Sequence, residues 1–436
     1  MEENLSFEDG GKLLRILDSG ESRVVDSWLS VSGTVPKSII TPQSAIENIH
    51  KKYSELLKDF PTLRLRLSFI DKKPYFKIAE NSELKFDNLV KKLESITPLY
   101  DELPEKTEMD KTSLWQLEIS ETEGEKTKLR LKMNHAIIDG RCIFDVLDIF
   151  YYTAVNKPFP ERLNSYRNQP MIYDFGKKSF FTDEIINIGF KEPEAHFKAI
   201  HAELTPPITL PSHVIQPQWE VPYPPISAFC KKHKVTCQAI IIAIQNEAIR
   251  LYHKGKFDDI PLFNFTPVDN RKYPYATELL KKSLFFYHIG DVLPVVYKKD
   301  NPLENILHCS EKFQEAYKTK DACISGYSRS NFTNEKGERV NNFTKPFHPN
   351  KSNFIFGSHI GLVGTEMDNL HFLSDFPISP YFYVLYLYGF HNLKTFYFSV
   401  NAPYNVPKEL FDTYKDVTMK YYDFIVNDIK ENKEKE

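Results

Sequence analysis

The chain has 436 residues, of which 41% are hydrophobic and 14% aromatic, so it is long enough for two domains and too apolar to be disordered. Its formal net charge of −3 at pH 7 offers no basic surface for nucleic acid, and we exclude that class of partner. The 5 cysteines are odd in number and show no Cys-X-X-Cys spacing. They predict reduced thiols rather than a disulfide framework or a metal site.

Targeting signals are not expected in this sequence. Residues 1–6 are acidic and contain no apolar run, which argues against a signal peptide. A transmembrane helix needs about 18 consecutive apolar residues, and no segment offers them. We therefore expect a cytoplasmic protein.

The first half of the chain predicts helices and paired strands. Residues 41–59 place apolar side chains at helical spacing, with Thr41 as the N-cap and Pro42 in the first helical position. The other elements expected in this half are two strand pairs and a helix, over residues 64–67 with 74–78, 114–119 with 128–133, and 141–153.

A proline-rich stretch separates this half from the next. The prolines between residues 206 and 225 exclude a continuous helix or a central strand, and we interpret residues 166–224 as a linker. Residues 225–252 then form the clearest helical block, with Thr236 as a candidate N-cap. The later elements expected are strands over 262–266, 284–288, 292–296, 353–356, 381–388 and 395–400, a polar loop over 321–351, and helices over 303–317 and 407–428.

The segment from His135 to Gly140 is the best candidate for a catalytic site. Imidazole suits proton transfer near neutral pH, so His135 is a candidate general base for a group that attacks an acyl carbon. Asp139 has two candidate roles, which are to orient the histidine or to hold the turn through an arginine or backbone N–H groups. Gly140 permits a backbone angle or a close approach that a side chain would block. Cys142 follows, but the sequence places no base beside its thiol.

Six segments, taken in order, resemble one acyltransferase superfamily. It contains chloramphenicol acetyltransferase, alcohol acetyltransferases, the plant BAHD enzymes and peptide-synthetase condensation domains. The HxxxDG motif at His135 lies, as in that family, after a hairpin and before a helix. The six matching segments are residues 15–21, 60–66, 135–140, 235–240, 267–271 and 356–361.

The resemblance implies an α/β fold of two similar chloramphenicol acetyltransferase-like domains, each a mixed β-sheet with helices, around a central channel. We place the domains at residues 1–165 and 225–436, joined by the linker 166–224. His135 would lie within the channel, where an acyl-CoA donor and the acceptor enter from opposite faces. Two covalently joined domains can complete one site, so we expect a monomer, whereas the trimeric acetyltransferase relatives use neighbouring subunits and leave the oligomeric state open.

The resemblance also implies roles for individual residues. His135 would be the general base, while Asp139 and Gly140 would support its loop. Arg271 is the first candidate to pair with Asp139 and Arg15 the second, because a bidentate guanidinium suits a buried carboxylate. Two further residues are candidates for contact with the oxyanion or the donor, namely Ser358 and His359.

The predicted reaction is transfer of an acyl group, in the first instance acetyl, from CoA to a hydroxyl acceptor through a tetrahedral intermediate. We expect acyl-CoA as a co-substrate, no bound cofactor and no metal. Asn134 stands where condensation domains carry a second histidine, which favours the alcohol-acetyltransferase-like branch. N-acylation of an amine and a carrier-protein donor remain alternatives. A non-catalytic relative that binds a small molecule or a partner protein is the alternative of another class.

Overall fold

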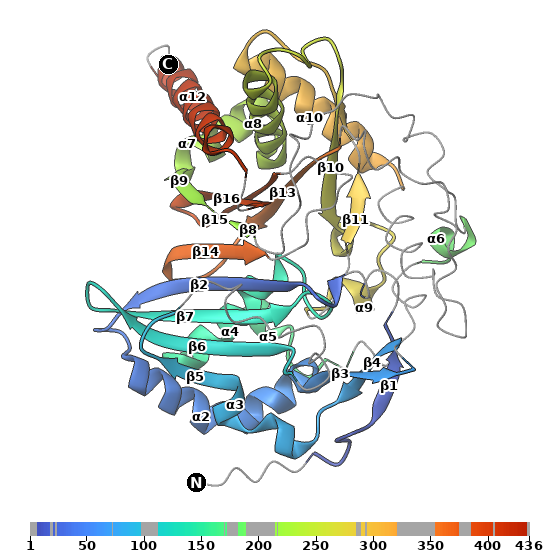
Figure 1. The fold of residues 1–436 in the computed structure, drawn as a ribbon, viewed down its shortest axis with the longest axis vertical. Helices are drawn as coiled ribbons and strands as arrows, with labels where there is room; N and C mark the ends of the chain where they lie inside the picture. Colours follow the sequence, from blue (N-terminus) through green and yellow to red (C-terminus); the bar gives the residue numbers. More distant parts are fainter. Residues whose placement is uncertain are drawn as a thin grey trace.

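Two mixed β-sheets with their helices make up most of the protein, seen in a computed structural model (Figure 1). The first half of the chain forms the lower part of the view and the second half the upper part. The predicted mixed α/β class is confirmed. The structure describes residues 7–17, 21, 24–71, 73–96, 112–169, 171, 182–188, 214–215, 217–284, 289–292, 294–320, 354–374, 385–403 and 406–433.

The lower sheet has five strands, which are, in order, β14 (Asp368–Ser374), β2 (Trp28–Pro36), β7 (Lys126–Asn134), β6 (Trp115–Thr122) and β5 (Val90–Leu93). β6 and β7 form the predicted antiparallel hairpin, whereas β5 runs parallel to β6. Two helices pack against this sheet, α2 (Pro42–Asp59) and α4 (Cys142–Ala154). Both were predicted, and Thr41 accepts a hydrogen bond from Ser44 N–H as the N-cap of α2.

Strand β14 belongs by sequence to the second half of the chain but pairs with β2 of the first half. In Figure 1 it lies directly above β2, between the two halves. The Ser399 hydroxyl donates a hydrogen bond of 2.9 Å to the Phe372 carbonyl, which ties β14 to the upper sheet. This exchange, which the sequence did not predict, joins the two halves through backbone pairing.

The upper sheet has eight strands, which are β11 (Ile289–Val292), β10 (Leu262–Asp269), β13 (Phe354–Leu362), β15 (Tyr386–His391), β16 (Thr395–Pro403) and β8 (Val214–Ile215), with β12 (Val295–Val296) beside β10 and β9 (Gln218–Pro222) beside β16. β13 pairs in parallel with β10 and β15. Because β9 joins this sheet, part of the predicted linker belongs structurally to the upper half. The domain boundaries themselves remain a prediction.

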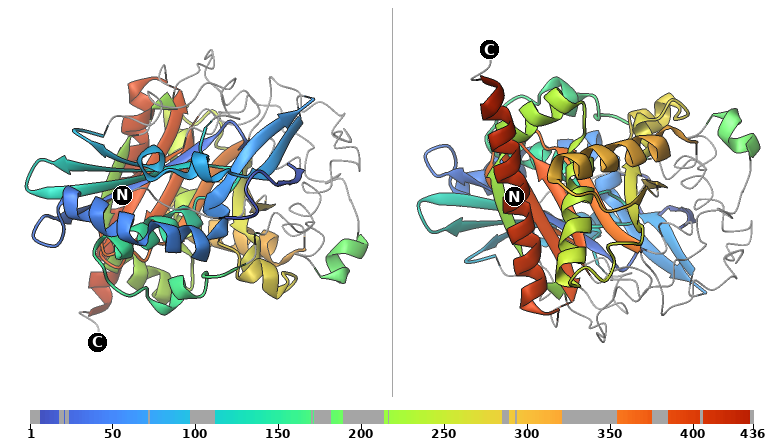
Figure 2. Two further views of the ribbon diagram at one scale, coloured as in Figure 1. Left: turned by 90° about the horizontal axis from the view of Figure 1, so that it is seen from below. Right: turned by 90° about the horizontal axis from the view of Figure 1, so that it is seen from above.

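Helices cover the upper sheet, as Figure 2 shows for the red, yellow-green and orange helices seen from above. They are α7 (Tyr223–His233), α8 (Cys237–Tyr252), α10 (Pro302–Lys318) and α12 (Lys408–Lys433). The block expected over 225–252 is therefore two helices. Lys234 between them has a φ of +55°, and the Thr236 hydroxyl accepts a hydrogen bond from Ala239 N–H to start α8.

The remaining elements are short. A three-stranded sheet contains β1 (Leu13–Ile16), β4 (Lys73–Ile78) and β3 (Leu65–Ile70). The short helices are α3 (Phe86–Leu89), α5 (Glu161–Asn164), α6 (Asp183–Ile188), α9 (Glu278–Lys281) and the 3-10 turns Pro61–Arg64, Asn81–Leu84 and Asn270–Lys272. The expected loop over 321–351 and most of the strand expected over 284–288 lie outside the described residues. Within the described ranges, no helix is long and apolar enough to cross a membrane.

Candidate functional site

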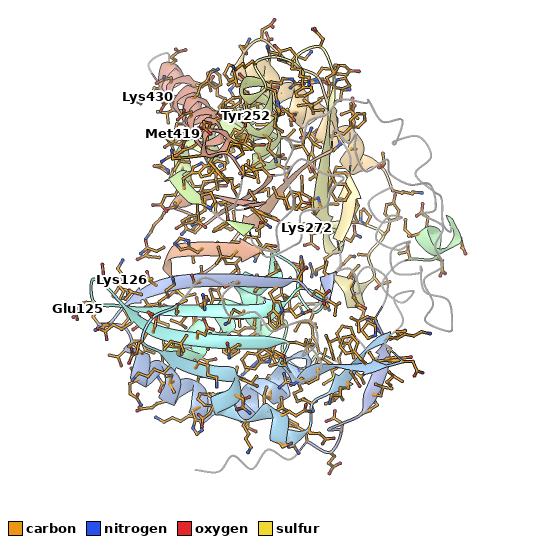
Figure 3. All side chains as sticks on the ribbon, in the orientation of Figure 1. Glu125, Lys126, Tyr252, Lys272, Met419 and Lys430 are labelled. Carbon is orange, nitrogen blue, oxygen red and sulfur yellow. The ribbon has the colours of Figure 1, made fainter. Side chains whose placement is uncertain are left out.

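His135 follows the last residue of β7, at the end of the strand opposite the hairpin turn. Figure 3 labels Glu125 and Lys126 at the outer tip of that hairpin. The side chain of Asn134 is buried and holds the turn, because its amide donates to Val25 O at 2.6 Å and its oxygen accepts from Ala136 N–H at 3.0 Å. Asn134 is therefore a structural part of the loop that carries His135.

The His135 ring is buried and held in one orientation. Its Nδ1 lies 2.7 Å from the carbonyl oxygen of Ile138. A carbonyl only accepts hydrogen bonds, so Nδ1 carries the proton and the lone pair of the neutral ring is on Nε2. Burial lowers the pKa of His135, and this outweighs the hydrogen bond to Ile138, which raises it. The ring is consequently neutral at pH 7, as a general base requires.

Asp139 supports this loop with both carboxylate oxygens. One oxygen accepts hydrogen bonds from the backbone N–H groups of Arg141, at 3.0 Å, and Cys142, at 2.9 Å. These groups begin α4 and have no partner within the helix, so the carboxylate caps it. The other oxygen forms an ion pair with Arg271. These contacts match the second candidate role of Asp139, which is to hold the turn through an arginine and backbone N–H groups rather than to contact the histidine ring.

Arg271 lies in the 3-10 turn after β10 and is held on three sides. Besides Asp139, its guanidinium donates to Asp269 at 2.9 Å and to the Ser283 carbonyl at 2.9 Å. Burial on its own would lower the pKa of Arg271, but the Asp139 carboxylate raises it well above its usual value. The second candidate for this pairing, Arg15, binds Glu21 instead at 2.8 Å.

Gly140 does not have a positive φ, so it does not adopt the left-handed backbone conformation that favours glycine. A Cβ placed on it would lie 3.6 Å from Phe372 and 3.7 Å from Ile360, which is ordinary van der Waals contact. Gly140 therefore has neither an unusual backbone angle nor a protein contact that a Cβ would block, and its role in supporting the loop stays a prediction.

Ser358 and His359 are neighbours on β13, and their side chains lie on opposite faces of the upper sheet. Ser358 is paired with Tyr388, whose ring contacts Phe372 of β14 with centroids 5.2 Å apart. Since Phe372 adjoins Gly140, the face that carries Ser358 is the one that meets the His135 loop. His359 lies on the face covered by α8, where its backbone N–H donates to Gln238 at 2.6 Å.

On the α8 side, the structure brings His359 together with Cys237 and His391, a cluster that the sequence did not indicate. Burial lowers the pKa of His359 to about 3, with a further contribution from the neighbouring His391. The three residues are more than 100 positions apart or on different strands, so no local spacing signals them. Cysteine and histidine side chains can both bind metals, and this is the one feature that the three residues share in the sequence.

Cys142 is buried beside the His135 loop. Burial raises the pKa of its thiol far above the usual value, so the thiolate that a nucleophile needs is disfavoured. Transfer without an acylated cysteine stays a prediction.

No protein-family model and no curated protein matches the chain. Solved structures do match. The trichothecene 15-O-acetyltransferase TRI3 from Fusarium sporotrichioides has a TM-score of 0.65 at 12% identity, over 97% of this chain and 98% of that one. The condensation domain of the Monacolin K polyketide synthase MokA has a TM-score of 0.61 at 10% identity, over 95% and 98%.

A third structure points the same way. Polyketide synthase associated protein 5 from Mycobacterium tuberculosis has a TM-score of 0.60 at 13% identity, over 94% of this chain and 98% of that one. This chain has the chloramphenicol acetyltransferase-like fold. The likeness extends over almost all of each compared chain, so the shared fold includes both halves of this protein.

Proposed function

We propose that this protein transfers an acyl group from a CoA thioester to a hydroxyl acceptor, with His135 as the general base. The observation that carries the proposal is the orientation of His135. Its Nδ1–H is committed to the Ile138 carbonyl, so the basic lone pair belongs to Nε2 of a ring whose pKa burial keeps low. A neutral, fixed imidazole is what general-base catalysis at neutral pH needs.

The proposed transfer has two stages, and His135 carries one proton through both. The acceptor hydroxyl loses its proton to His135 Nε2 while its oxygen bonds to the thioester carbon. The tetrahedral intermediate then collapses, the carbon–sulfur bond breaks, and the departing sulfur receives the proton from Nε2. The products are the ester and free CoA thiol, and the histidine returns to its neutral state.

Other residues would position the His135 ring and stabilise the developing oxyanion. Asp139 and Arg271 fix the start of α4 and hence the carbonyl of Ile138 that orients the ring. Ser358, on the sheet face that meets the loop, would donate a hydrogen bond to the developing oxyanion or to the donor. We assign His359 no donor contact, because its ring lies on the α8 face.

The names of the similar structures support the reaction class. TRI3 is named as an O-acetyltransferase, and MokA contributes a condensation domain. Both names are compatible with acyl transfer from a thioester. Because Asn134 binds Val25 and Ala136, it is committed to the loop rather than to an acceptor amine, which favours the O-acyltransferase over a condensation-type reaction.

The test is release of free thiol from a panel of acyl-CoAs, with mixed alcohol and amine acceptors. Wild type is compared with His135→Ala and with His308→Ala, a control histidine on α10. We expect acceptor-dependent release that falls by about 10²- to 10⁴-fold in His135→Ala only. Release that survives in His135→Ala would contradict the assignment of the base. If no acyl-CoA releases free thiol and CoA itself does not bind, the donor would instead be a carrier protein, or the protein would be a binding protein.

A further inference from the structure

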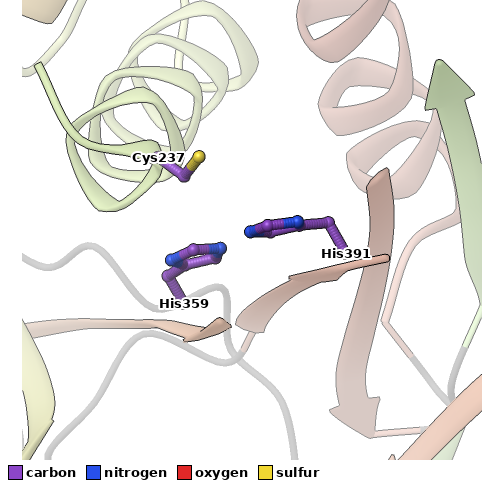
Figure 4. A group of neighbouring side chains, drawn as sticks. All are labelled: Cys237, His359 and His391. Carbon is purple, nitrogen blue, oxygen red and sulfur yellow. The ribbon is translucent and has the colours of Figure 1, made fainter. Parts of the chain in front are cut away.

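Three side chains that bind metals elsewhere converge between α8 and the upper sheet. Cys237 is the first residue of α8, His359 lies on β13 and His391 ends β15. Their ligand atoms lie within 4.8 Å of one another. Figure 4 shows the two imidazole rings edge to edge, with the sulfur of Cys237 on the same side of both.

His391 is oriented as a metal ligand would be. Its Nδ1 lies 3.1 Å from the carbonyl oxygen of Asn392, so this nitrogen donates and the lone pair belongs to Nε2. Ligating histidines commonly use their second nitrogen in this manner, which fixes both tautomer and ring direction. Tyr223 stacks on the ring with centroids 3.8 Å apart and limits its rotation.

His359 supplies an unsatisfied nitrogen. Its Nε2 is buried and has no hydrogen-bond partner among the described residues. A buried polar atom without a partner is costly, and such atoms in a folded protein call for an explanation. The ring is also held parallel to that of His391, at an angle of 8°, so the two imidazoles are already arranged side by side.

A second cysteine lies beside the first. The sulfur of Cys230 on α7 is 3.9 Å from that of Cys237. Two thiolates on one tetrahedral zinc ion, each bound at about 2.3 Å, are about 3.8 Å apart. The observed separation is therefore suited to a shared metal, whereas a disulfide would need the sulfurs at about 2.05 Å.

We propose that Cys237, His359 and His391 bind one zinc ion, and that Cys230, whose sulfur is close to Cys237 but lies outside that group of mutually close ligand atoms, moves in as the fourth ligand. Two thiolates and two neutral imidazoles form a Cys₂His₂ set of the kind found in closed structural zinc sites. Binding would displace one proton from each thiol and leave no position open for substrate. The ion would join α7 and α8 to β13 and β15, and so would fix the strand that carries Ser358 on its other face.

The test uses the full, reduced chain, stripped with a chelator and titrated with Zn²⁺ and with Co²⁺. We expect one equivalent of either metal to bind, with the sulfur-to-cobalt charge-transfer band and the strong visible bands of tetrahedral Co²⁺. Zn²⁺ should also raise the melting temperature, because it binds the folded state. This experiment needs no substrate and does not depend on the proposed acyl transfer.

Matched variants separate this site from incidental binding. Cys237→Ser and His391→Asn should lose the stoichiometric metal and the thermal shift, while Cys309→Ala, a buried cysteine in α10, should keep both. Cys230→Ser should bind more weakly and show a reduced charge-transfer band. Absence of stoichiometric metal in the reduced wild-type chain would overturn the proposal without reference to any variant. Unchanged binding in both Cys237→Ser and His391→Asn would overturn it as well.

Discussion

The carboxylate of Asp139 pairs with the guanidinium of Arg271 across 132 positions of the chain. Asp139 follows the lower sheet and Arg271 follows β10 of the upper sheet, so this contact joins the two halves next to His135. The side chains are only 6% and 8% exposed, respectively. A charge pair so shielded from water is costly to break on one side, because the remaining charge stays buried.

Removing one member of this pair should destabilise the protein. We expect Arg271→Gln and Asp139→Asn each to lower the free energy of unfolding by about 3–5 kcal/mol. Urea denaturation measures the effect. Arg271→Lys keeps the charge but loses the planar fork that binds Asp139, Asp269 and Ser283 together, so it should lie between wild type and Arg271→Gln.

The double variant Asp139→Asn/Arg271→Gln tests whether the two residues act as a pair. Its loss should be smaller than the sum of the single losses by about 0.5–3 kcal/mol. Strict additivity would mean that each residue stabilises the fold through its other contacts and that the ion pair contributes nothing.

The pH dependence of activity should reflect the burial of His135. Burial lowers its pKa below the ordinary value of about 6.5, so the base stays neutral at pH values where an exposed histidine is protonated. The value of kcat/KM should therefore stay level as the pH falls through 6.5 and decline only at lower pH. A decline centred above pH 6.5 would contradict this assignment.

The same shift has a consequence for stability. The folded state favours neutral His135. The contribution of this preference to the free energy of unfolding is therefore complete above the unfolded pKa of about 6.5. It is lost progressively as the pH falls from there toward the lower folded pKa. In His135→Gln, which cannot titrate, the free energy of unfolding should depend less on pH in this acid range.

Cys142 should not be needed for chemistry. Because burial raises the pKa of its thiol, the residue is a poor nucleophile, and Cys142→Ala should retain acyl transfer. Iodoacetamide at neutral pH should leave Cys142 unmodified in the folded protein, as peptide mass spectrometry would show. Loss of turnover in a folded Cys142→Ala would instead indicate a covalent intermediate.

Two glycines should respond differently to the same substitution. A Cβ on Gly33 of β2 would lie 2.8 Å from Cβ of Met367, just before the exchanged strand β14. We expect Gly33→Ala to lower the free energy of unfolding by about 1–3 kcal/mol through overpacking. Gly140→Ala is the control, since its Cβ would meet ordinary contact distances, and chemical denaturation should find it close to wild type.

The activity of Gly140→Ala tests whether the substrate lies beside this residue. If the substrate occupies the space beside Gly140, the added methyl group should raise KM or lower kcat although the fold is intact. Full activity would show that neither the backbone nor the substrate needs a glycine here.

The sequence by itself determined the local structure around the candidate base. Periodic apolar residues and a capping threonine specify α2, and alternation specifies the β6–β7 hairpin, because these signals act over a few neighbouring residues. The same reasoning placed His135 at the end of a strand and before a helix. The resemblance to an acyltransferase superfamily, and not local spacing, indicated Arg271 as the first partner for Asp139.

Only the tertiary structure decided which distant residues meet. No strand is predicted over the residues of β14, and no local pattern indicates that they pair with β2, more than 300 positions away. Likewise, the face of β13 that His359 occupies depends on strand register and on where α8 packs, so its meeting with Cys237 and His391 could not be read in advance. Pairing and packing are cooperative properties of the whole chain, whereas a sequence pattern reports only on its own segment.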